Sequence, residues 1–245
     1  MATEFADKPT KGFALTQIMS ECPEVADAYD ALFGALRLAP PLASGNVILV
    51  TSAEPGEGKT TVASCLATTA SLAGQTVLLI DGDLRRSSLT ATVGSGDTAG
   101  LIEILLGEAE AAEAIHPITA LTESPQAGVV SFMARGRKST RFLGAVDWSK
   151  ARTAFRSISQ AFGMVFLDSP PILAANDALL FARIVDAVVL VVGTGNANLD
   201  RIRRAKEHLD AAGTPIIGTV LNRFEPKVHG PSNQPYRSYY RDLRT

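Results

Sequence analysis

Residues 53–60 read A-E-P-G-E-G-K-T, a glycine-rich turn that ends in a lysine and a hydroxyl residue. The run fits the Walker A pattern, with alanine at the first position, which is usually glycine. Gly56 and Gly58 let the backbone curl, so that successive N–H groups point inward and form a nest for an anion. The lysine then reaches the β- and γ-phosphates, and the threonine offers a hydroxyl to magnesium. The predicted contacts to ATP are Gly56, Glu57, Gly58, Lys59, Thr60 and Thr61.

Three aspartates follow apolar runs further along the chain: Asp81 and Asp83 in VLLIDGDLRR, and Asp168 in MVFLDSPP. Carboxylates at the C-terminal ends of parallel strands face the ligand crevice, where they hold Mg²⁺ directly or through water. An aspartate after a strand is often only a helix N-cap, but two carboxylates with Arg85 beside them exceed what a cap requires. We therefore assign Arg85 to the nucleotide site. The predicted catalytic residues are Lys59, Asp81, Asp83 and Asp168, and the predicted magnesium ligands are Thr60, Asp81, Asp83 and Asp168.

Five short apolar runs alternate with helical segments and would carry these loops. The runs are rich in Val, Ile and Leu without polar alternation, which is typical of strands buried on both faces. They span residues 47–51, 76–80, 164–167, 187–192 and 216–221. The clearest helical segments span residues 24–38, 60–73 and 199–212. Strands that alternate with helices predict an α/β fold with a doubly wound, mainly parallel sheet, flanked by helices and joined by right-handed crossovers.

Two of the predicted helices have one apolar side. In residues 24–38 the apolar positions recur at helical spacing, and the prolines after Ala39 end the helix because proline removes a donor. In residues 199–212 charges lie on the opposite side, as in a helix that covers a sheet. The apolar positions are Val25, Ala28, Tyr29, Leu32 and Leu36 in the first segment, and Leu199, Ile202, Ala205 and Leu209 in the second.

Residues 87–144 give a weaker pattern. Leu101, Ile104 and Leu105 indicate a short helix. Residues 121–141 show no clear period and hold several glycines and basic residues. Two interpretations stay open for this segment: a flexible loop near the substrate, and a surface insertion.

The composition fits one globular α/β domain. Of the 245 residues, 46% are apolar and 20% charged, and the net charge of −2 gives no electrostatic argument for binding nucleic acid. Cys22 and Cys65 form no C-x-x-C pair, which favours two reduced thiols in the cytosol. The longest apolar runs are too short to span a bilayer, and residues 1–11 are not a secretory signal. We therefore expect a cytoplasmic protein without a membrane span.

The segments TSAEPGEGKTT, VLLIDGDLRR, MVFLDSPPIL and GTVLNR together resemble a known family. The resemblance is to the bacterial tyrosine kinases of capsular and exopolysaccharide biosynthesis, which are P-loop NTPases of the MinD/ParA-like superfamily. It covers residues 25–223 and implies an ATP-dependent protein-tyrosine autokinase that regulates polysaccharide synthesis and export. It also implies that Asp81 accepts the tyrosine proton or helps to bind magnesium, and that Asn222 recognises adenine.

Tyrosines concentrate at the end of the chain. Three of the four, Tyr236, Tyr239 and Tyr240, lie in the last ten residues. Residues 223–245 hold five basic and two acidic residues with three prolines, a composition typical of a disordered, solvated segment. The cluster resembles the family's autophosphorylation sites, and the alternative is a basic tail with incidental aromatics. The predicted organisation is a mobile arm (1–23), a kinase domain (24–223) and a flexible, tyrosine-containing tail (224–245).

The rival class is the division-site and partition ATPases, which share the fold and switch partner or oligomer state with bound nucleotide. They carry an extra lysine early in the phosphate loop, which reaches the nucleotide of a dimer partner. Glu54 stands at the corresponding position. A carboxylate cannot neutralise phosphate, so Glu54 favours the kinase interpretation over the switch.

The chain also departs from the kinase family. The family's Glu-x-x-Arg-x-x-Arg motif, which seats one subunit on the next, aligns with Asp27, Asp30 and Phe33, so both arginines are missing. Ser87 stands where the family has proline after its DLRR. These differences argue against ring assembly of a homo-oligomer. The resemblance further implies an activating membrane protein, a polysaccharide chain-length regulator, that would recruit the kinase to the inner face of the membrane.

Overall fold

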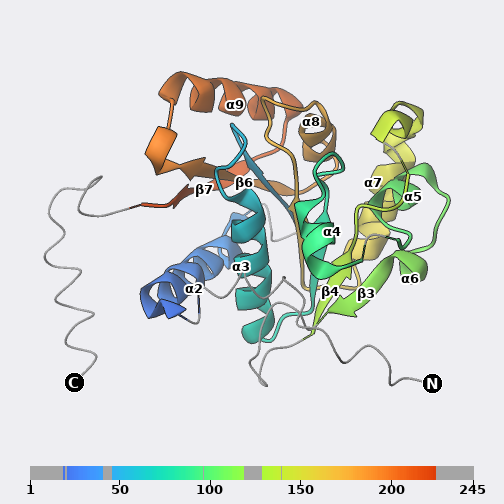
Figure 1. The fold of residues 1–245 in the computed structure, drawn as a ribbon, viewed down its shortest axis with the longest axis horizontal. Helices are drawn as coiled ribbons and strands as arrows, with labels where there is room; N and C mark the ends of the chain where they lie inside the picture. Colours follow the sequence, from blue (N-terminus) through green and yellow to red (C-terminus); the bar gives the residue numbers. More distant parts are fainter. Residues whose placement is uncertain are drawn as a thin grey trace, which may run out of the picture.

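A seven-stranded sheet forms the centre of the computed structural model (Figure 1). The structure describes residue 19 and residues 21–40, 46–95, 97–118, 129–138 and 140–224. The strand order is β3-β4-β2-β5-β1-β6-β7, and every neighbouring pair is parallel except β3 with β4. The strands are β1 (Val47–Ser52), β2 (Val77–Asp81), β3 (Ile115–Ile118), β4 (Val130–Met133), β5 (Met164–Asp168), β6 (Ala187–Gly193) and β7 (Ile216–Asn222).

The five strands predicted from the apolar runs are all present, within one residue at either end. Every residue of β1, β2, β5 and β6 is buried, which explains why the sequence shows no polar alternation there. The edge strand β7 is only partly buried. The prediction of a doubly wound, mainly parallel sheet is confirmed.

The sequence analysis did not predict strands β3 and β4. β4 also corrects the interpretation of its segment as a loop or surface insertion. Residues 130–133, inside the segment interpreted as a loop or surface insertion, form β4, which pairs in parallel with β2. β3 then pairs with β4 in the antiparallel sense and closes that edge. Both strands have four residues, too few to show a period. Residues 119–128, between them, lie outside the described residues.

Helices cover both faces of the sheet (Figure 1). One apolar core lies between the sheet and α2 (Pro23–Arg37), α3 (Lys59–Leu72) and α4 (Ser88–Val93). The opposite core lies under α5 (Leu101–Leu106), α7 (Trp148–Ser159), α8 (Asp177–Ala182) and α9 (Leu199–Ala212). Short elements complete the chain: α6 (Ala111–Ala114), η2 (Thr140–Ala145) and η3 (Thr194–Asn196). In the described part of the chain, none of the helices has the length and apolar content needed to cross a membrane.

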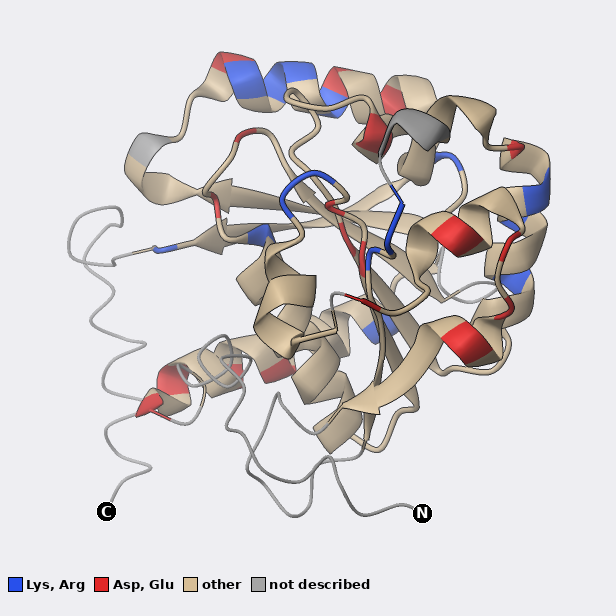
Figure 2. Cartoon of the chain, turned by 45° about the vertical axis from the view of Figure 1, so that its right-hand side comes forward, with Lys and Arg blue, Asp and Glu red and all other residues tan. Residues whose placement is uncertain are grey.

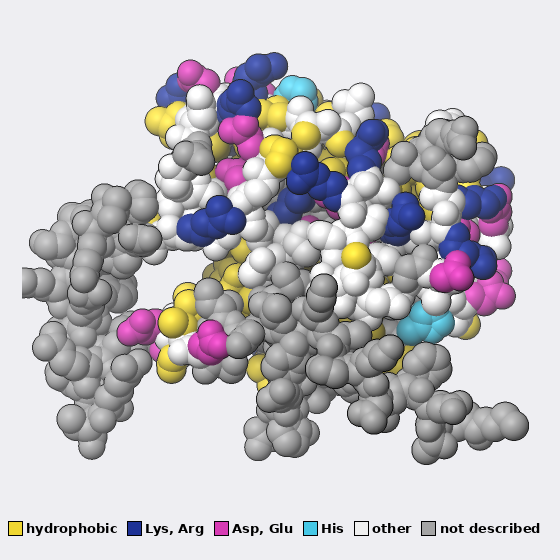
Figure 3. All heavy atoms as spheres, in the orientation of Figure 1, with side chains coloured by type: hydrophobic (Ala, Val, Ile, Leu, Met, Phe, Trp, Pro, Cys, Tyr) yellow, Lys and Arg dark blue, Asp and Glu magenta, His cyan; other side chains and the backbone are white. Residues whose placement is uncertain are grey.

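The predicted amphipathic helices form, but Ala28 and Leu199, predicted on their apolar sides, are exposed. α9 buries Ala205 and Leu209 completely against the sheet, and its charged side chains lie on the outer surface (Figure 3). Leu199, the first residue of α9, is 68% exposed. α2 packs on α3 through Tyr29 and Leu36.

The strand order brings the three loops of interest to one edge. β1 pairs with β5, and β5 pairs with β2, so the loops that follow these three strands leave adjacent carboxyl ends. In doubly wound sheets this edge is where ligands bind. Ser87, in the loop after β2, has a φ of 49°, which the ring of the family's proline forbids. Proline is therefore incompatible with the backbone of this chain at the entry into α4.

Candidate functional site

The phosphate loop (residues 53–60) joins β1 to α3 and contains two left-handed glycines. Gly56 has a φ of 82° and Gly58 a φ of 93°. A Cβ added to Gly58 would lie 2.0 Å from Nδ2 of Asn222, so that a side chain does not fit without displacing Asn222. Gly58 directly precedes α3, whose N-terminal end therefore faces the loop. This curl, with the positive end of a 14-residue helix behind it, is the geometry that binds phosphate.

Lys59 and Thr60 meet carboxylates from two other loops. In Figure 2, basic (blue) and acidic (red) segments lie close together near the centre of the molecule. Nζ of Lys59 lies 3.7 Å from Oδ2 of Asp83, and the Lys59 residue is only 9% exposed. The hydroxyl of Thr60 donates a 2.7 Å hydrogen bond to Oδ2 of Asp168. Thr61, the next residue of α3, is partly buried. The structure thus brings together four of the residues predicted for catalysis or magnesium.

Asp168 is fully buried and only half satisfied. Its Oδ2 accepts from Thr60, whereas its Oδ1 has no hydrogen-bond partner among the described residues. Burial raises the pKa of Asp168 to about 7, although the charge of Lys59 opposes the rise. An unpaired buried carboxylate oxygen is costly unless a cation or water completes it. The unused oxygen beside a threonine hydroxyl therefore fits a hard cation.

Magnesium suits this donor set. No group of three or more His, Cys, Asp or Glu side chains within the described ranges could hold a metal ion by itself. Mg²⁺ usually keeps several waters and takes one or two carboxylates together with phosphate oxygens of a substrate. Asp168 and Thr60 therefore fit an ion that arrives with a nucleotide rather than a resident metal.

Asp81 is buried at the end of β2, directly beside Asp168. The two aspartates are register partners on neighbouring strands. Asp81 Oδ1 accepts from the backbone N–H of Asp83 at 3.1 Å, and its Oδ2 accepts from that of Thr90 at 2.7 Å. Burial raises the pKa of Asp81 to about 6, against the opposing hydrogen bonds from Thr90. The carboxylate is thus held in a fixed orientation by the start of α4.

Arg85 is held by a residue that the sequence did not single out. Its Nε donates to Oδ2 of Asp177 at 2.9 Å, and its Nη2 donates to Oδ1 at 3.3 Å. Asp177 is the first residue of α8 and is 5% exposed. The only local signal for it was an acidic residue at a helix start, which many helices share.

β7 and β6 close the other side of the phosphate loop. Nδ2 of Asn222 donates to the carbonyl of Glu57 at 2.9 Å. The Glu57 carboxylate accepts from the backbone N–H groups of Glu54 at 2.7 Å and of Gly193 at 3.1 Å. Glu54, at the position of the extra lysine in the switch ATPases, forms an ion pair with Arg201 of α9. Asn222 thus lies against the loop, on the side opposite the aspartates' strands.

Several predicted residues lie outside the described part of the chain. They are the three tail tyrosines, Tyr236, Tyr239 and Tyr240, and residues 1–18 and 20 of the predicted N-terminal arm. The described chain ends two residues after Asn222, at Phe224. The tail and arm assignments stay predictions.

The fold and the phosphate loop define a nucleotide-binding domain of the P-loop class. Residues 48–240 match the family model described as the CobQ/CobB/MinD/ParA nucleotide binding domain. Solved relatives support the same class. The cell division ATPase MinD of Pyrococcus furiosus has a TM-score of 0.61 and 26% identity, covering 80% of each chain.

Other relatives identify the family to which the chain belongs within this class. The chain is 31% identical over 187 residues to the tyrosine-protein kinase YwqD of Bacillus subtilis, covering 74% of each protein. It is 33% identical over 184 residues to the tyrosine-protein kinase CpsD of Streptococcus pneumoniae, covering 75% of this chain and 78% of CpsD. The kinase domain of the Escherichia coli tyrosine kinase ETK has a TM-score of 0.76 and 26% identity, covering 91% of this chain and 87% of that one. The chain belongs to the bacterial tyrosine-protein kinase family, as its motifs predicted.

Proposed function

We propose that this protein is an ATP-dependent autokinase that transfers the γ-phosphate of magnesium-bound ATP to tyrosines of its own tail. The acceptors are Tyr236, Tyr239 and Tyr240, and the phosphorylation regulates the synthesis and export of capsular or exopolysaccharide. The observation that carries the proposal is the cluster of Lys59, Thr60, Asp83 and Asp168 at one edge of the sheet. The membership in a tyrosine kinase family supports the choice of tyrosine as acceptor.

In this proposal the phosphate loop holds the triphosphate. Backbone N–H groups around Gly56 and Gly58 receive the phosphate oxygens, and Lys59 contacts the β- and γ-phosphates. Thr60 and Asp168 would hold the magnesium ion, and Asp81 and Asp83 would complete its surroundings. When bound, the ion neutralises charge on the phosphates. Together these residues would hold the γ-phosphate in line with the hydroxyl oxygen of the acceptor tyrosine.

Asp81 is the proposed base. A tyrosine hydroxyl has a pKa near 10 and is a poor nucleophile at neutral pH. As the bond between tyrosine oxygen and phosphorus forms and the bond to ADP breaks, the hydroxyl proton passes to the Asp81 carboxylate. A carboxyl whose pKa is raised to about 6 is a stronger base than an ordinary one, yet it is mostly ionised at neutral pH.

The remaining predicted contacts lie around the nucleotide. Asn222 and the carbonyl of Glu57 would flank the adenine side, since both lie where β7 meets the phosphate loop. Thr61 would face the phosphates from the first turn of α3. Arg85 would approach from the loop after β2.

The partner and the location follow from family resemblance. We propose a cytoplasmic kinase recruited to the inner face of the membrane by a separate chain-length regulator. Asp27 and Asp30 are exposed on α2, but Phe33, at the third motif position, is 5% exposed and packs in the core. We therefore propose that subunits do not form a ring through this motif.

A nucleotide switch of the MinD/ParA type is not favoured. Such a switch needs a cation that crosses to the partner's nucleotide. Glu54 is a carboxylate at that position, and its ion pair with Arg201 ties it to α9 of its own chain.

Intact mass spectrometry before and after incubation with ATP and magnesium tests the proposal. We expect phosphate to be added to the wild-type chain, localised to residues 236–240 by peptide mapping, and absent from Lys59→Ala. Addition of the cytoplasmic segment of a candidate regulator should raise the extent of tail phosphorylation. A chain that binds ATP but gains no phosphate, with or without that segment, would contradict the kinase proposal.

The variant Asp81→Asn tests the base. We expect phosphotransfer to fall by about 10²-fold, because general base catalysis contributes on that order. Some ATP binding should remain, because the phosphate loop and Lys59 are unaltered. The measurement is the rate of tail phosphorylation beside the dissociation constant of a fluorescent ATP analogue. Retained activity would remove Asp81 from the mechanism.

A further inference from the structure

We propose that Asp177 is a positioning residue for phosphotransfer, which holds Arg85 in place and so leaves Asp83 available to Lys59. The inference rests on the proposed function and extends it to a residue of α8 that is not among the predicted nucleotide contacts. Asp177 contacts Arg85 in the loop after β2, which also carries Asp83.

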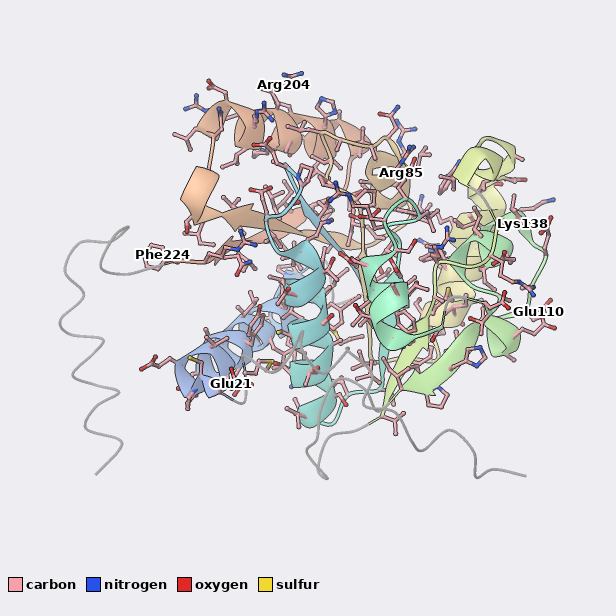
Figure 4. The ribbon with its side chains drawn as sticks, in the orientation of Figure 1. Glu21, Arg85, Glu110, Lys138, Arg204 and Phe224 are labelled. Atoms are coloured by element: carbon pink, nitrogen blue, oxygen red, sulfur yellow. The ribbon has the colours of Figure 1, made fainter. Side chains whose placement is uncertain are left out.

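The contact between Asp177 and Arg85 is specific. The buried carboxylate accepts from Nε and Nη2 of the guanidinium, so both of its oxygens are used. This two-bond geometry fixes the direction of the planar group as well as its distance. The Arg85 side chain is 55% exposed, and its Nη1 faces away from Asp177. Figure 4 shows Arg85 beside α8, at the edge of the sheet where the site lies.

Asp83 pairs with Lys59 and lies in the same loop as Arg85. Its Oδ2 is 3.7 Å from Nζ of Lys59, and its Oδ1 accepts from the backbone N–H of Arg86 at 3.1 Å. The pKa of Arg85 is raised, first by its hydrogen bond to Asp177 and then by the charge of that residue, with a further contribution from Asp83. Two ion pairs, Lys59 with Asp83 and Arg85 with Asp177, therefore meet in the loop after β2, which carries both Asp83 and Arg85.

This arrangement is important in the proposal because Arg85 and Lys59 would otherwise compete for the carboxylate of Asp83. A guanidinium binds a carboxylate through two parallel hydrogen bonds, whereas an ammonium acts as a point charge. Without Asp177, a carboxylate open to Arg85 would be Asp83, which lies two residues earlier in the same loop and whose charge already acts on Arg85. Arg85 would then displace Lys59 from Asp83, and the lysine would no longer be held beside the phosphate loop.

A double-mutant cycle in the full chain tests this series of contacts. Asp177→Asn keeps the shape but not the charge, and we expect the affinity for a fluorescent ATP analogue to fall about tenfold. Arg85→Gln removes the competing cation. We expect Asp177→Asn to have no further effect in the Arg85→Gln background, because the residue acts only through Arg85. Asp210→Asn is the matched control, since Asp210 also pairs with a cation, Lys206, but on the outer side of α9.

A purely structural role would give a different pattern. It would lower the melting temperature but leave the ATP affinity of the folded protein unchanged. Should Arg85→Gln fold poorly, Arg85→Lys keeps the charge without the fork, and Asp177→Asn should then cost less than twofold in affinity. An unaltered affinity in Asp177→Asn, or a full tenfold loss that persists in the Arg85→Gln background, would overturn the inference.

The readout separates this inference from the function on which it rests. A wild-type chain that binds ATP but does not phosphorylate its tail contradicts the kinase proposal alone, because the affinity cycle still decides the role of Asp177. A wild-type chain that phosphorylates its tail, with an Asp177→Asn variant that matches it in ATP affinity, contradicts the inference alone. A wild-type chain that does not bind ATP overturns both.

Discussion

Replacing Asp168 by asparagine is expected to abolish activity and, at the same time, to stabilise the ligand-free protein. The two effects have one cause, the burial of a carboxylate whose Oδ1 has no partner among the described residues. In the proposed mechanism that oxygen holds magnesium, and metal ions contribute several kcal/mol to phosphotransfer. We therefore expect a loss of about 10³-fold or more in the rate of tail phosphorylation.

The gain in stability follows from proton linkage. The pKa of Asp168 is about 7 in the folded protein, against 3.8 as the ordinary value expected in the unfolded chain. Between these values the folded state holds a proton that the unfolded state has released, so the free energy of unfolding falls as the pH rises from about 4 to about 7. Asparagine does not ionise, so at this position the variant does not lose stability as the pH rises. The difference in pKa corresponds to at most ~4 kcal/mol above pH 7.

Urea unfolding at pH 5 and pH 8, without nucleotide, measures this effect. The wild type should lose more stability between the two pH values than Asp168→Asn. Asp81, whose pKa is about 6, should leave a smaller slope of the same sign in the variant. Magnesium and ATP should raise the melting temperature of the wild type but hardly that of the variant. A variant that is less stable than the wild type at pH 8 would contradict this account of Asp168.

The sequence was most informative where one residue type had to satisfy one local requirement. β1, β2, β5 and β6 are buried on both faces, so their residues had to be apolar except at the carboxyl ends, where the site begins. The meeting of Thr60 with Asp168 could also be predicted, because loops that follow neighbouring parallel strands leave the same edge of the sheet.

Contacts between distant residues left no such pattern. Asp177 lies 92 residues from Arg85, and Arg201 lies 147 residues from Glu54. Each residue alone looks like a solvated charge near a helix start, and only the fold brings the pairs together. β4 was missed for a related reason. Its four residues are too few to show a period, and what marks them as a strand is their pairing with β2.

A second variant, Gly58→Ala, is expected to reduce ATP affinity by roughly 10²-fold. The φ of 93° at Gly58 is one that residues with a Cβ rarely adopt, at a cost of about 1–3 kcal/mol. The added methyl would also meet Nδ2 of Asn222 at 2.0 Å, which must move and give up its hydrogen bond to Glu57. These costs together reach ~3 kcal/mol. The ligand-free variant avoids them by relaxing the loop, and ATP binding must then restore the curl, which corresponds to roughly 10²-fold in the dissociation constant.

Gly74→Ala separates the backbone cost from the clash. Gly74 has a φ of 78° and lies in the turn after α3, with nothing within 4 Å of an added Cβ. Its replacement should cost about 1 kcal/mol in stability, from the left-handed backbone alone, and leave ATP affinity unchanged. In Gly58→Ala/Asn222→Ala the clash is removed, so the melting temperature should recover toward that of Asn222→Ala. If Gly58→Ala binds the fluorescent ATP analogue as tightly as Gly74→Ala does, the curl at Gly58 is not what forms the phosphate site.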